Sequence, residues 1–256
     1  MRAQVVRNIA SWSVGAVVLV AASGAFAAEN APGQSREEIE HIIHEYIVSH
    51  PEVVGEAVKK LREQRLTTQQ QRVRETIATK QDELFQDPTS PTAGQLHDGV
   101  RIVEFFDYRC PYCKSVSGTV ATLLSENPNV RVIFKELPIL GSDSLLAAKA
   151  ALAAKKQGAY LNFHTALMKT AGVITLATIE EIAKDLRLDA EKLKNDMESQ
   201  EIQETLTSNR RLASALTIQS TPTFIVESEI ATGALNLATF QILIGKAQAN
   251  QSGHVQ

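Results

Sequence analysis

The stretch VEFFDYRCPYCK, residues 103–114, contains both cysteines of the 256-residue chain, Cys110 and Cys113. It begins inside a short apolar run, VRIVEFF over residues 100–106, which is typical of a strand buried on both faces of a sheet. Pro111 follows the first cysteine, and its fixed φ angle suits the first turn of a helix. The stretch therefore predicts a strand that ends just before Cys110 and a helix that begins directly after it.

The residues that follow complete a βαβ pattern. The helical segment extends to about Ser125, and Asn127-Pro128 ends it. The next apolar run, VRVIF over residues 130–134, predicts a second strand. A strand, a helix and a strand of these lengths are typical of a βαβ unit.

A long helical region follows this unit. Residues 144–216 are rich in Ala, Leu, Glu and Lys with helical periodicity, which predicts several successive helices. Strand character returns at residues 223–226, TFIV, and a final helix is expected from about Leu237 to Gln248. The sequence thus predicts an α/β fold whose sheet is split by a large helical insertion.

The first 27 residues differ in character from the rest of the chain. Arg2 and Arg7 precede an apolar run over residues 9–22, and Ala25-Phe26-Ala27 supplies the small residues that a signal peptidase reads. The run is shorter than the roughly 20 apolar residues that a membrane-spanning helix needs, which argues against a membrane anchor. We expect a signal peptide at residues 1–27 and a mature protein in the periplasm.

The charge balance argues against a nucleic-acid-binding protein. The chain has 26 Lys and Arg residues against 29 Asp and Glu residues, and its formal net charge is −3. A nucleic-acid surface would require a basic patch or stripe, which this sequence does not show. We therefore expect no nucleic acid among its partners.

Residues 28–88 predict a helical segment ahead of the sheet. After a short polar linker, apolar residues recur at the spacing of one helical stripe: Ile39, Ile42, Ile43, Tyr46 and Ile47. Pro51 limits this helix, and Ser49 with Glu52 forms a capping-box pattern that predicts the start of a second helix.

The end of this segment leaves two interpretations open. Its apolar residues are widely spaced: Leu66, Val73, Ile77 and Leu84. Such spacing suits a helix that lies along a partner, and it equally suits an amphipathic helix folded back on its own domain. Asp87-Pro88 breaks the helix and marks the boundary to a domain at residues 89–256.

The two cysteines suit redox chemistry better than a structural role. Only Pro111 and Tyr112 separate Cys110 from Cys113, so a disulfide between them closes a small loop and removes little unfolded-chain entropy. A redox cysteine reacts as its thiolate, and the N-terminus of a helix stabilises that anion. We therefore expect Cys110, at the start of the helix, to be the nucleophile, and Cys113, one turn further in, to be the resolving thiol.

Other uses of the cysteine pair remain open. A zinc site normally needs four ligands and the sequence offers no second Cys or His pair nearby, whereas two thiolates could hold the soft ion Cu(I). A cysteine hydrolase would need a histidine base, and the sequence does not place His97 or His164 near Cys110. His41 and His44 could form a metal pair, but a solvated helix face explains them better. We expect no cofactor and no metal site, with a copper-binding or holdase-type binding protein as the alternative function.

Three stretches resemble the DsbA-like branch of the thioredoxin superfamily, which contains exported thiol-disulfide oxidoreductases. They are VEFFDYRCPYCK, FKELPILG at residues 134–141 and STPTFIV at residues 220–226. The resemblance implies a thioredoxin fold with a helical domain inserted at about residues 140–216. It further implies an enzyme that forms or isomerises disulfides in other exported proteins, with a membrane redox partner.

The resemblance also implies roles for residues outside the cysteine pair. It makes Pro222 a cis-proline beside the active site, so that Thr221 would offer its backbone N–H and C=O to an extended substrate segment. Without the cysteines, these two residues would suit an ordinary strand-opening turn. Glu104 matches a family acidic position and could relay protons to the resolving thiol with Lys135 as partner, or it could be a strand-end carboxylate that reaches water. Tyr112 could shape substrate access or cover the helix start.

The helices of residues 28–88 resemble the extra segment of the suppressor-of-copper-sensitivity C proteins and related bacterial surface antigens. Some members of that subgroup oligomerise through this segment, which implies a homo-oligomer and favours isomerase activity. One departure from the family is Glu227-Ser228-Glu229, where relatives tend to have a turn with Gly or Asp. This departure puts the local hairpin geometry in doubt.

Overall fold

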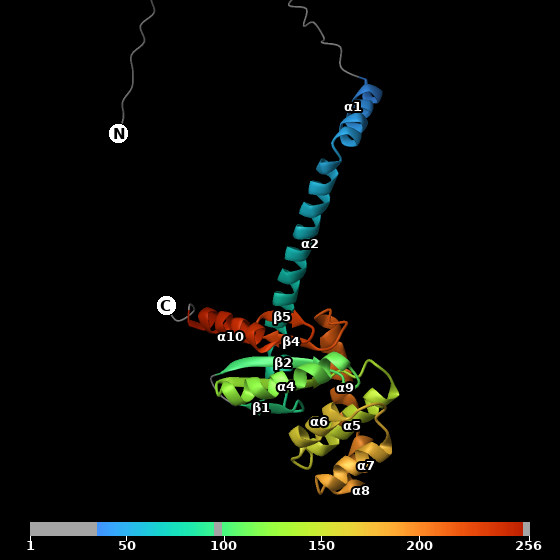
Figure 1. Ribbon diagram of the computed structural model, residues 1–256, viewed down its shortest axis with the longest axis vertical. Coiled ribbons are helices and arrows are strands. Elements are labelled where there is room, and N and C mark those ends of the chain that lie inside the picture. Colours follow the sequence, from blue (N-terminus) through green and yellow to red (C-terminus); the bar gives the residue numbers. More distant parts are fainter. Residues whose placement is uncertain (1–34, 95–98, 253–256) are drawn as a thin grey trace, which may run out of the picture. The chain divides into compact units, whose positions relative to one another are not determined.

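Two parallel strands form the centre of a five-stranded sheet in the computed structural model (Figure 1). β2 (Val100–Phe106) pairs with β3 (Val130–Glu136), and α4 (Pro111–Glu126) connects them. The other strands pair in antiparallel fashion: β1 (Thr92–Gly94) with β3, β4 (Thr223–Val226) with β2, and β5 (Glu229–Thr232) with β4. The order β1-β3-β2-β4-β5 confirms the predicted βαβ unit.

The structure describes residues 35–94 and 99–252, without the side chains of residues 251 and 252. The expected signal peptide and His97 lie outside the described residues. The chain divides into two units, one up to Lys59 and one from Lys60 onward. No helix of the described ranges combines the length and apolar character needed to cross a bilayer.

The strand directions gather three chain segments at one edge of the sheet. β2 and β3 are parallel, so both end at this edge, and antiparallel β4 begins there, with Thr223 paired to Phe105. Because β2 lies between β3 and β4, the turn that follows β2 lies between the loop after β3 and the loop before β4. That turn contains Cys110.

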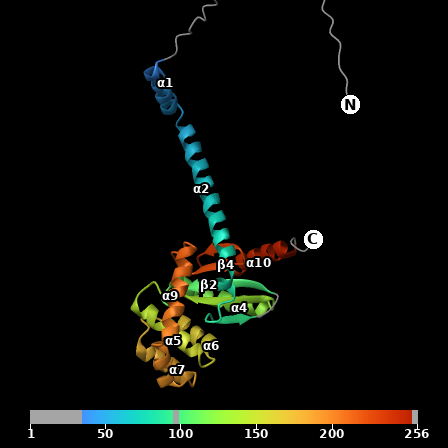
Figure 2. The ribbon, with the colours of Figure 1, turned by 180° about the vertical axis from the view of Figure 1, so that it is seen from behind.

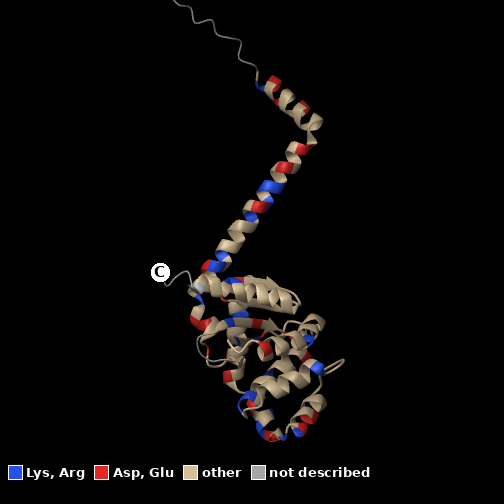
Figure 3. Ribbon diagram, turned by 60° about the vertical axis from the view of Figure 1, so that its left-hand side comes forward, with Lys and Arg blue, Asp and Glu red and all other residues tan. Residues whose placement is uncertain are grey.

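The helical insertion follows β3, and a final helix closes the fold (Figure 2). Its helices are α5 (Ser142–Lys155), α6 (Tyr160–Lys169), α7 (Leu176–Asp185), α8 (Ala190–Met197) and α9 (Gln200–Ala215), and α10 (Leu237–Ser252) follows β5. Alanines dominate the buried surface of α5, which lets neighbouring helices approach closely. Basic and acidic residues both occur along these helices (Figure 3), and the ion pair of Lys156 with Glu201 at 2.7 Å joins the end of α5 to α9.

Each face of the sheet has its own core, because successive residues of a strand point to opposite faces. Ile102 and Phe106 of β2 pack in the larger core with α4, α10 and most of the insertion. Val103 and Phe105 pack in the second core with the last turns of α9. The two-sided burial of β2 accounts for its nearly continuous apolar sequence.

The second half of α2 (Pro51–Thr79) belongs to this second core. Val73 and Ile77 are buried there together with Leu84 of α3 (Gln81–Phe85), whereas Leu66 is exposed. The interpretation in which this helix folds back on its own domain is therefore confirmed for Val73, Ile77 and Leu84.

The first unit contains α1 (Arg36–Ser49) and the start of α2, and none of the residues of α1 is buried. Ser35 and Glu38 form a capping box at its N-terminus. The predicted break at Pro51 is confirmed, but Ser49 is the last residue of α1 and does not begin the next helix. The capping pattern at Ser49 was misleading because Pro51 itself occupies the first helical position of α2.

The hairpin between β4 and β5 forms despite its unusual sequence. Val226 pairs with Glu229, which leaves Glu227 and Ser228 as the turn, and Glu227 adopts a positive φ of 52°. Its carboxylate accepts hydrogen bonds from the backbone N–H of Arg101 at 2.8 Å and from the guanidinium of the same residue. These bonds offset the backbone strain of a positive φ at a residue other than glycine.

Candidate active site

Cys110 occupies the N-cap of α4, and Pro111 follows at the first helical position, as the sequence predicted. The backbone N–H of Cys110 donates to the carbonyl oxygen of Asp107 at 3.1 Å, which fixes the turn between β2 and α4. Cys110 is 4% exposed. At this position the free N–H groups of the first helical turn and the positive end of the helix dipole favour an anion.

The residue before Pro222 lies directly beside this cysteine. The Cys110 thiol donates a hydrogen bond to the carbonyl oxygen of Thr221 at 3.1 Å, and the Thr221–Pro222 peptide bond is cis. The geometry therefore brings Cys110, Thr221 and Pro222 together. Tyr112, two residues after Cys110, is 66% exposed and is accessible to a partner molecule.

Cys113 lies one turn further into α4 and is fully buried as a free thiol. Burial raises its pKa well above the ordinary range, and an N–H bond from the backbone of Asp107 opposes this only in part. The thiol therefore remains protonated at neutral pH. Any reaction in which it attacks a disulfide needs a group that accepts its proton.

Glu104, on β2, has a buried carboxyl group on the face of the sheet that packs against α4. Burial raises its pKa to about 8, so it is mostly protonated at neutral pH, and its charge would raise the pKa of Cys113 further. This carboxyl group does not reach water, because the residue is almost completely buried. A group with such a pKa can both donate and accept a proton near physiological pH.

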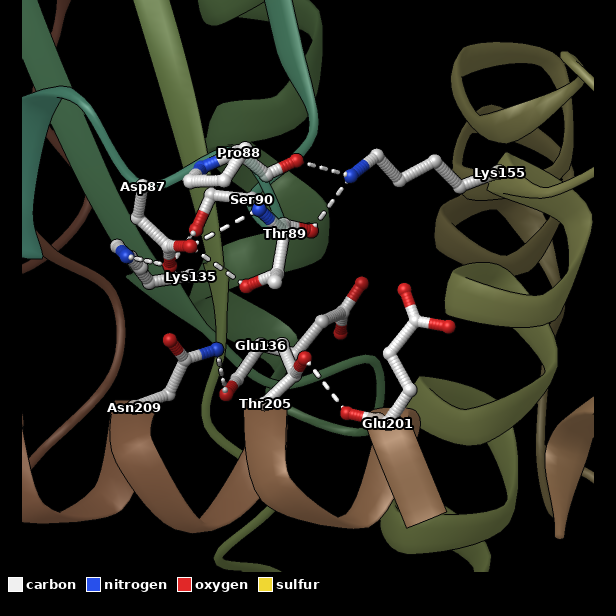
Figure 4. Close-up of polar contacts among 10 residues, drawn as sticks. All are labelled: Asp87, Pro88, Thr89, Ser90, Lys135, Glu136, Lys155, Glu201, Thr205 and Asn209. Carbon is white, nitrogen blue, oxygen red and sulfur yellow. Dashed lines mark hydrogen bonds and ion pairs between the residues drawn. The ribbon is translucent and has the colours of Figure 1, made fainter. Parts of the chain in front are cut away.

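Lys135 does not accompany Glu104, contrary to the expectation. Lys135 pairs with Phe105 in the sheet, so its side chain points to the face opposite Glu104. It is 1% exposed and donates to Oδ2 of Asp87 at 2.7 Å (Figure 4). Burial lowers the pKa of Lys135, and the ion pair with Asp87 counteracts that shift.

Asp87 accepts hydrogen bonds from the turn that follows it as well as from Lys135. Its carboxylate also accepts bonds from the backbone N–H and hydroxyl of Thr89 and from the hydroxyl of Ser90 (Figure 4). Burial alone would raise the pKa of Asp87, but Lys135 and these hydroxyl groups lower it to about 2. Lys135 and Asp87 therefore form a structural pair.

A buried polar network that the sequence analysis missed lies behind the cysteine turn. Glu136 Oε1 accepts bonds from Tyr108 at 2.9 Å and Tyr160 at 2.8 Å, and the Tyr108 hydroxyl also lies 3.0 Å from Nδ1 of His164. Burial raises the pKa of Glu136 and lowers that of His164 to about 3. His164 therefore stays neutral and forms a hydrogen bond with the Tyr108 hydroxyl. The available signal for Glu136 was an acidic residue just after an apolar strand run.

Two cationic side chains lie near the start of α4. Lys114 donates to the carbonyl oxygen of Thr170, and burial together with the charge of Arg109 lowers its pKa. Arg109 forms an ion pair with Asp143, Nε to Oδ2 at 2.9 Å. Among the described residues, no group of three or more His, Cys, Asp or Glu side chains could hold a metal ion.

Comparisons with known proteins match two parts of the chain to family models. Residues 101–245 match the family described as DSBA-like thioredoxin domain, and residues 36–65 match the Copper resistance protein ScsC N-terminal domain. The chain is 30% identical over 165 residues to the Probable disulfide bond formation protein D of Bacillus anthracis, covering 59% of this chain and 76% of that protein. It is 28% identical over 152 residues to Na(+)/H(+) antiporter NhaA 1 of Salinispora arenicola, and it spans only 23% of that protein's length.

Solved structures extend the comparison to most of the chain. A thioredoxin-like oxidoreductase from Silicibacter pomeroyi is 40% identical, with 66% of this chain and 97% of that chain covered and a TM-score of 0.64. ScsC of Proteus mirabilis in a transitional conformation is 30% identical, with 84% and 97% covered and a TM-score of 0.64. Salmonella enterica Typhimurium BcfH is 27% identical, with 82% and 95% covered and a TM-score of 0.70.

Proposed function

The chain belongs to the DSBA-like thioredoxin domain family, and from this premise we propose that it is an exported thiol-disulfide oxidoreductase whose nucleophile is Cys110. The observation that carries the proposal is the position of the Cys110 sulfur. It lies at the N-terminus of α4, 3.1 Å from the carbonyl oxygen of Thr221, with a second thiol buried one turn behind it. Its substrates are exported proteins with thiols or disulfides.

In the oxidising direction, the enzyme starts with a Cys110–Cys113 disulfide. A substrate thiolate attacks Cys110, the bond to Cys113 breaks, and Cys113 leaves with the electron pair and takes a proton. A second substrate thiolate then attacks the substrate sulfur of the mixed disulfide and releases Cys110 as a thiolate. The substrate gains a disulfide, the enzyme becomes a dithiol, and a membrane redox partner oxidises it again.

Glu104 supplies and accepts the proton at Cys113. With a pKa of about 8 it holds a proton at neutral pH, which it gives to the leaving Cys113 sulfur. In the reverse step, its carboxylate takes the proton when Cys113 attacks the mixed disulfide. In isomerisation, the Cys110 thiolate attacks a wrong substrate disulfide, and Cys113 resolves any complex that stalls.

The first unit brings copies of the chain together. Its apolar side chains are exposed along the helices: Ile39, Ile42, Ile43, Tyr46, Ile47, Val54 and Val58. An exposed apolar stripe of this kind favours a partner in water, and a second copy offers a matching stripe. Residues 36–65, which match the ScsC N-terminal domain, include this stripe. An assembly with several active sites favours isomerisation over oxidation.

Two cysteine variants test the activity. Cys110→Ser should abolish both the reduction of insulin and the refolding of scrambled ribonuclease, because no sulfur remains to form the mixed disulfide. Cys113→Ser should keep the first attack and lose its resolution. Full activity of Cys110→Ser would remove this residue from the mechanism.

Copper binding is a second candidate, because residues 36–65 match a domain of a copper resistance protein and two thiolates can hold Cu(I). It predicts that one Cu(I) ion binds per cysteine pair and that turnover of disulfide substrates is absent. Titration with Cu(I) under reducing conditions, beside the insulin assay, distinguishes the two functions.

A further inference from the structure

The turn that contains Cys110 has a different neighbour on each side. Thr221 precedes β4 on one side, and residues 137–141 follow β3 on the other. In the loop 137–141, Ile139 and Leu140 present apolar side chains that are 39% and 44% exposed. A substrate segment that lies against Thr221 with its sulfur on Cys110 would meet this loop across the turn.

One buried carboxylate joins the turn to that loop. Asp107 is 1% exposed, and its Oδ2 accepts bonds from the backbone N–H groups of Ile139 at 2.8 Å and Leu140 at 3.0 Å. Its Oδ1 accepts bonds from the backbone N–H of Arg109 and from the hydroxyl of Ser144, both at 2.7 Å. Asp107 thus ties the residue before Cys110 to the loop and to the first turn of α5.

Only a carboxylate can satisfy all four of these donors. An aspartate accepts at both oxygens, whereas the NH2 group of an asparagine would face either the two loop amides or the amide of Arg109, and the Ser144 hydroxyl could accept from it. Either both bonds to the loop or the bond to Arg109 would then be lost in a buried place, where an unmet donor is costly. The loop would lose either its link to Arg109 or its hold on Ile139 and Leu140.

We propose that Asp107 is a positioning residue for disulfide exchange, which fixes Ile139 and Leu140 as the wall of the substrate site on the side opposite Thr221. The apolar part of the substrate polypeptide next to its reacting cysteine packs against this wall. The inference rests on the proposed function and adds a determinant of substrate binding to it. Asp107 acts through the loop and does not touch the reacting sulfur atoms.

The test compares Asp107→Asn with Asp87→Asn, which changes another carboxylate that accepts four hydrogen bonds, one of them from Lys135. Each variant, in its oxidised form, is assayed with a two-cysteine peptide flanked by apolar residues and with dithiothreitol. We expect Asp107→Asn to raise the KM for the peptide about tenfold and to leave the dithiothreitol rate within about twofold, because a small dithiol does not reach the loop. Asp87→Asn should change neither value.

Equal slowing of both reactions by Asp107→Asn, or an unchanged KM, would overturn the proposal. The double variant Ile139→Ser/Leu140→Ser changes only exposed side chains and should raise the peptide KM in the same way if Asp107→Asn does not fold. An unchanged KM for this double variant would likewise contradict the proposal.

Hydrogen exchange separates this inference from the proposed function. In the wild-type protein the amides of Ile139 and Leu140 should be protected by Asp107, and Asp107→Ala, which removes both carboxylate oxygens, should expose both amides to exchange. This readout needs no redox activity, so a chain without any disulfide exchange would refute the proposed function while the loss of protection would still show the link. Unchanged protection of both amides would overturn the link itself.

Discussion

The Cys110 sulfur lies 3.1 Å from the carbonyl oxygen of Thr221, although the two residues are 111 positions apart in the chain. The contact arises because β4 runs antiparallel to β2 and begins at the edge where β2 ends. The whole helical insertion lies between these two strands in the sequence. An active site that is assembled in this way depends on strand order rather than on local sequence.

Glu104→Gln should slow the step in which Cys113 attacks a mixed disulfide. The wild-type rate should rise as pH passes through about 8, because Glu104 can accept the proton of Cys113 only once it is itself deprotonated. The glutamine cannot accept it, so we expect a rate about 100-fold lower above pH 8 and a smaller difference at pH 6. Release of thionitrobenzoate from the mixed disulfide of Cys110 measures this step.

The control for this prediction is Glu136→Gln. Glu136 is also buried with a raised pKa, but its carboxyl oxygen is held by Tyr108 and Tyr160. We expect the pH dependence of release to persist in this variant. An inflection near pH 8 that survives in Glu104→Gln would assign the proton transfer to another group.

Asp87→Asn should destabilise the protein in a way that depends on pH. Its pKa is lowered from 3.8 to about 2 in the folded state, so the ionised carboxylate stabilises the fold above pH 3.8 and this contribution is lost as pH falls through about 2. We expect a loss of about 2 kcal/mol at pH 7, below the figure for a fully buried pair because Asp87 is partly exposed. Urea unfolding of the variant and the wild-type protein at pH 7 and at pH 2 measures the difference in the free energy of unfolding.

Asp82→Asn is the matched control, because Asp82 is exposed and accepts a bond only from Gln86. Its effect should be close to zero at either pH. A loss of stability in Asp87→Asn that is the same at pH 2 and pH 7 would mean that the ion pair with Lys135 does not contribute.

Ile43→Lys should disrupt the assembly of the chain through its first unit. The substitution places a charge in the middle of the exposed apolar stripe, which should separate the copies. Glu37→Lys places a lysine on the opposite side of α1 and should leave the oligomer intact. Light scattering gives the molar mass, and a monomeric wild-type protein would contradict the assignment of this stripe to a second copy.

A deletion of the first unit should end at residue 59. Val73 and Ile77 lie further along α2 and are buried in the second core, so a deletion that removes them would also destabilise the catalytic domain. The shortened chain should remain a folded monomer with lower isomerase activity. Equal isomerase activity in both forms would show that assembly does not set the direction of the reaction.

The main helices and the βαβ unit could be predicted because the residues that begin or end an element, and the periodic spacing of apolar residues, are local signals. Pro111 and Asn127 bound α4 in the sequence as they do in the structure. The strand β1, with three residues, was missed because so short a segment leaves no periodic pattern. The turn at Glu227 could not be judged, since the hydrogen bonds that support it come from Arg101 on another strand.

The cysteines and Thr221 were predicted by motif, whereas their polar surroundings were not. The hydrogen bonds of Asp107 join segments that are more than thirty residues apart. Lys135 was assigned to Glu104 because the two lie on neighbouring strands, but the pairing of Lys135 with Phe105 turns it to the opposite face. A shift of one residue in the strand pairing decides whether two side chains lie on the same face of the sheet, and the sequence does not give that pairing register.

The most direct test of the mechanism is to identify the sulfur that bonds to the substrate. A one-cysteine peptide activated as its mixed disulfide with thionitrobenzoate, added to reduced Cys113→Ser, should release thionitrobenzoate and leave a stable mixed disulfide on Cys110 that mass spectrometry of a tryptic digest locates. Reduced Cys110→Ser should form no adduct under the same conditions, because Cys113 is buried and protonated. An adduct on Cys113 in that variant, formed at a comparable rate, would contradict the account.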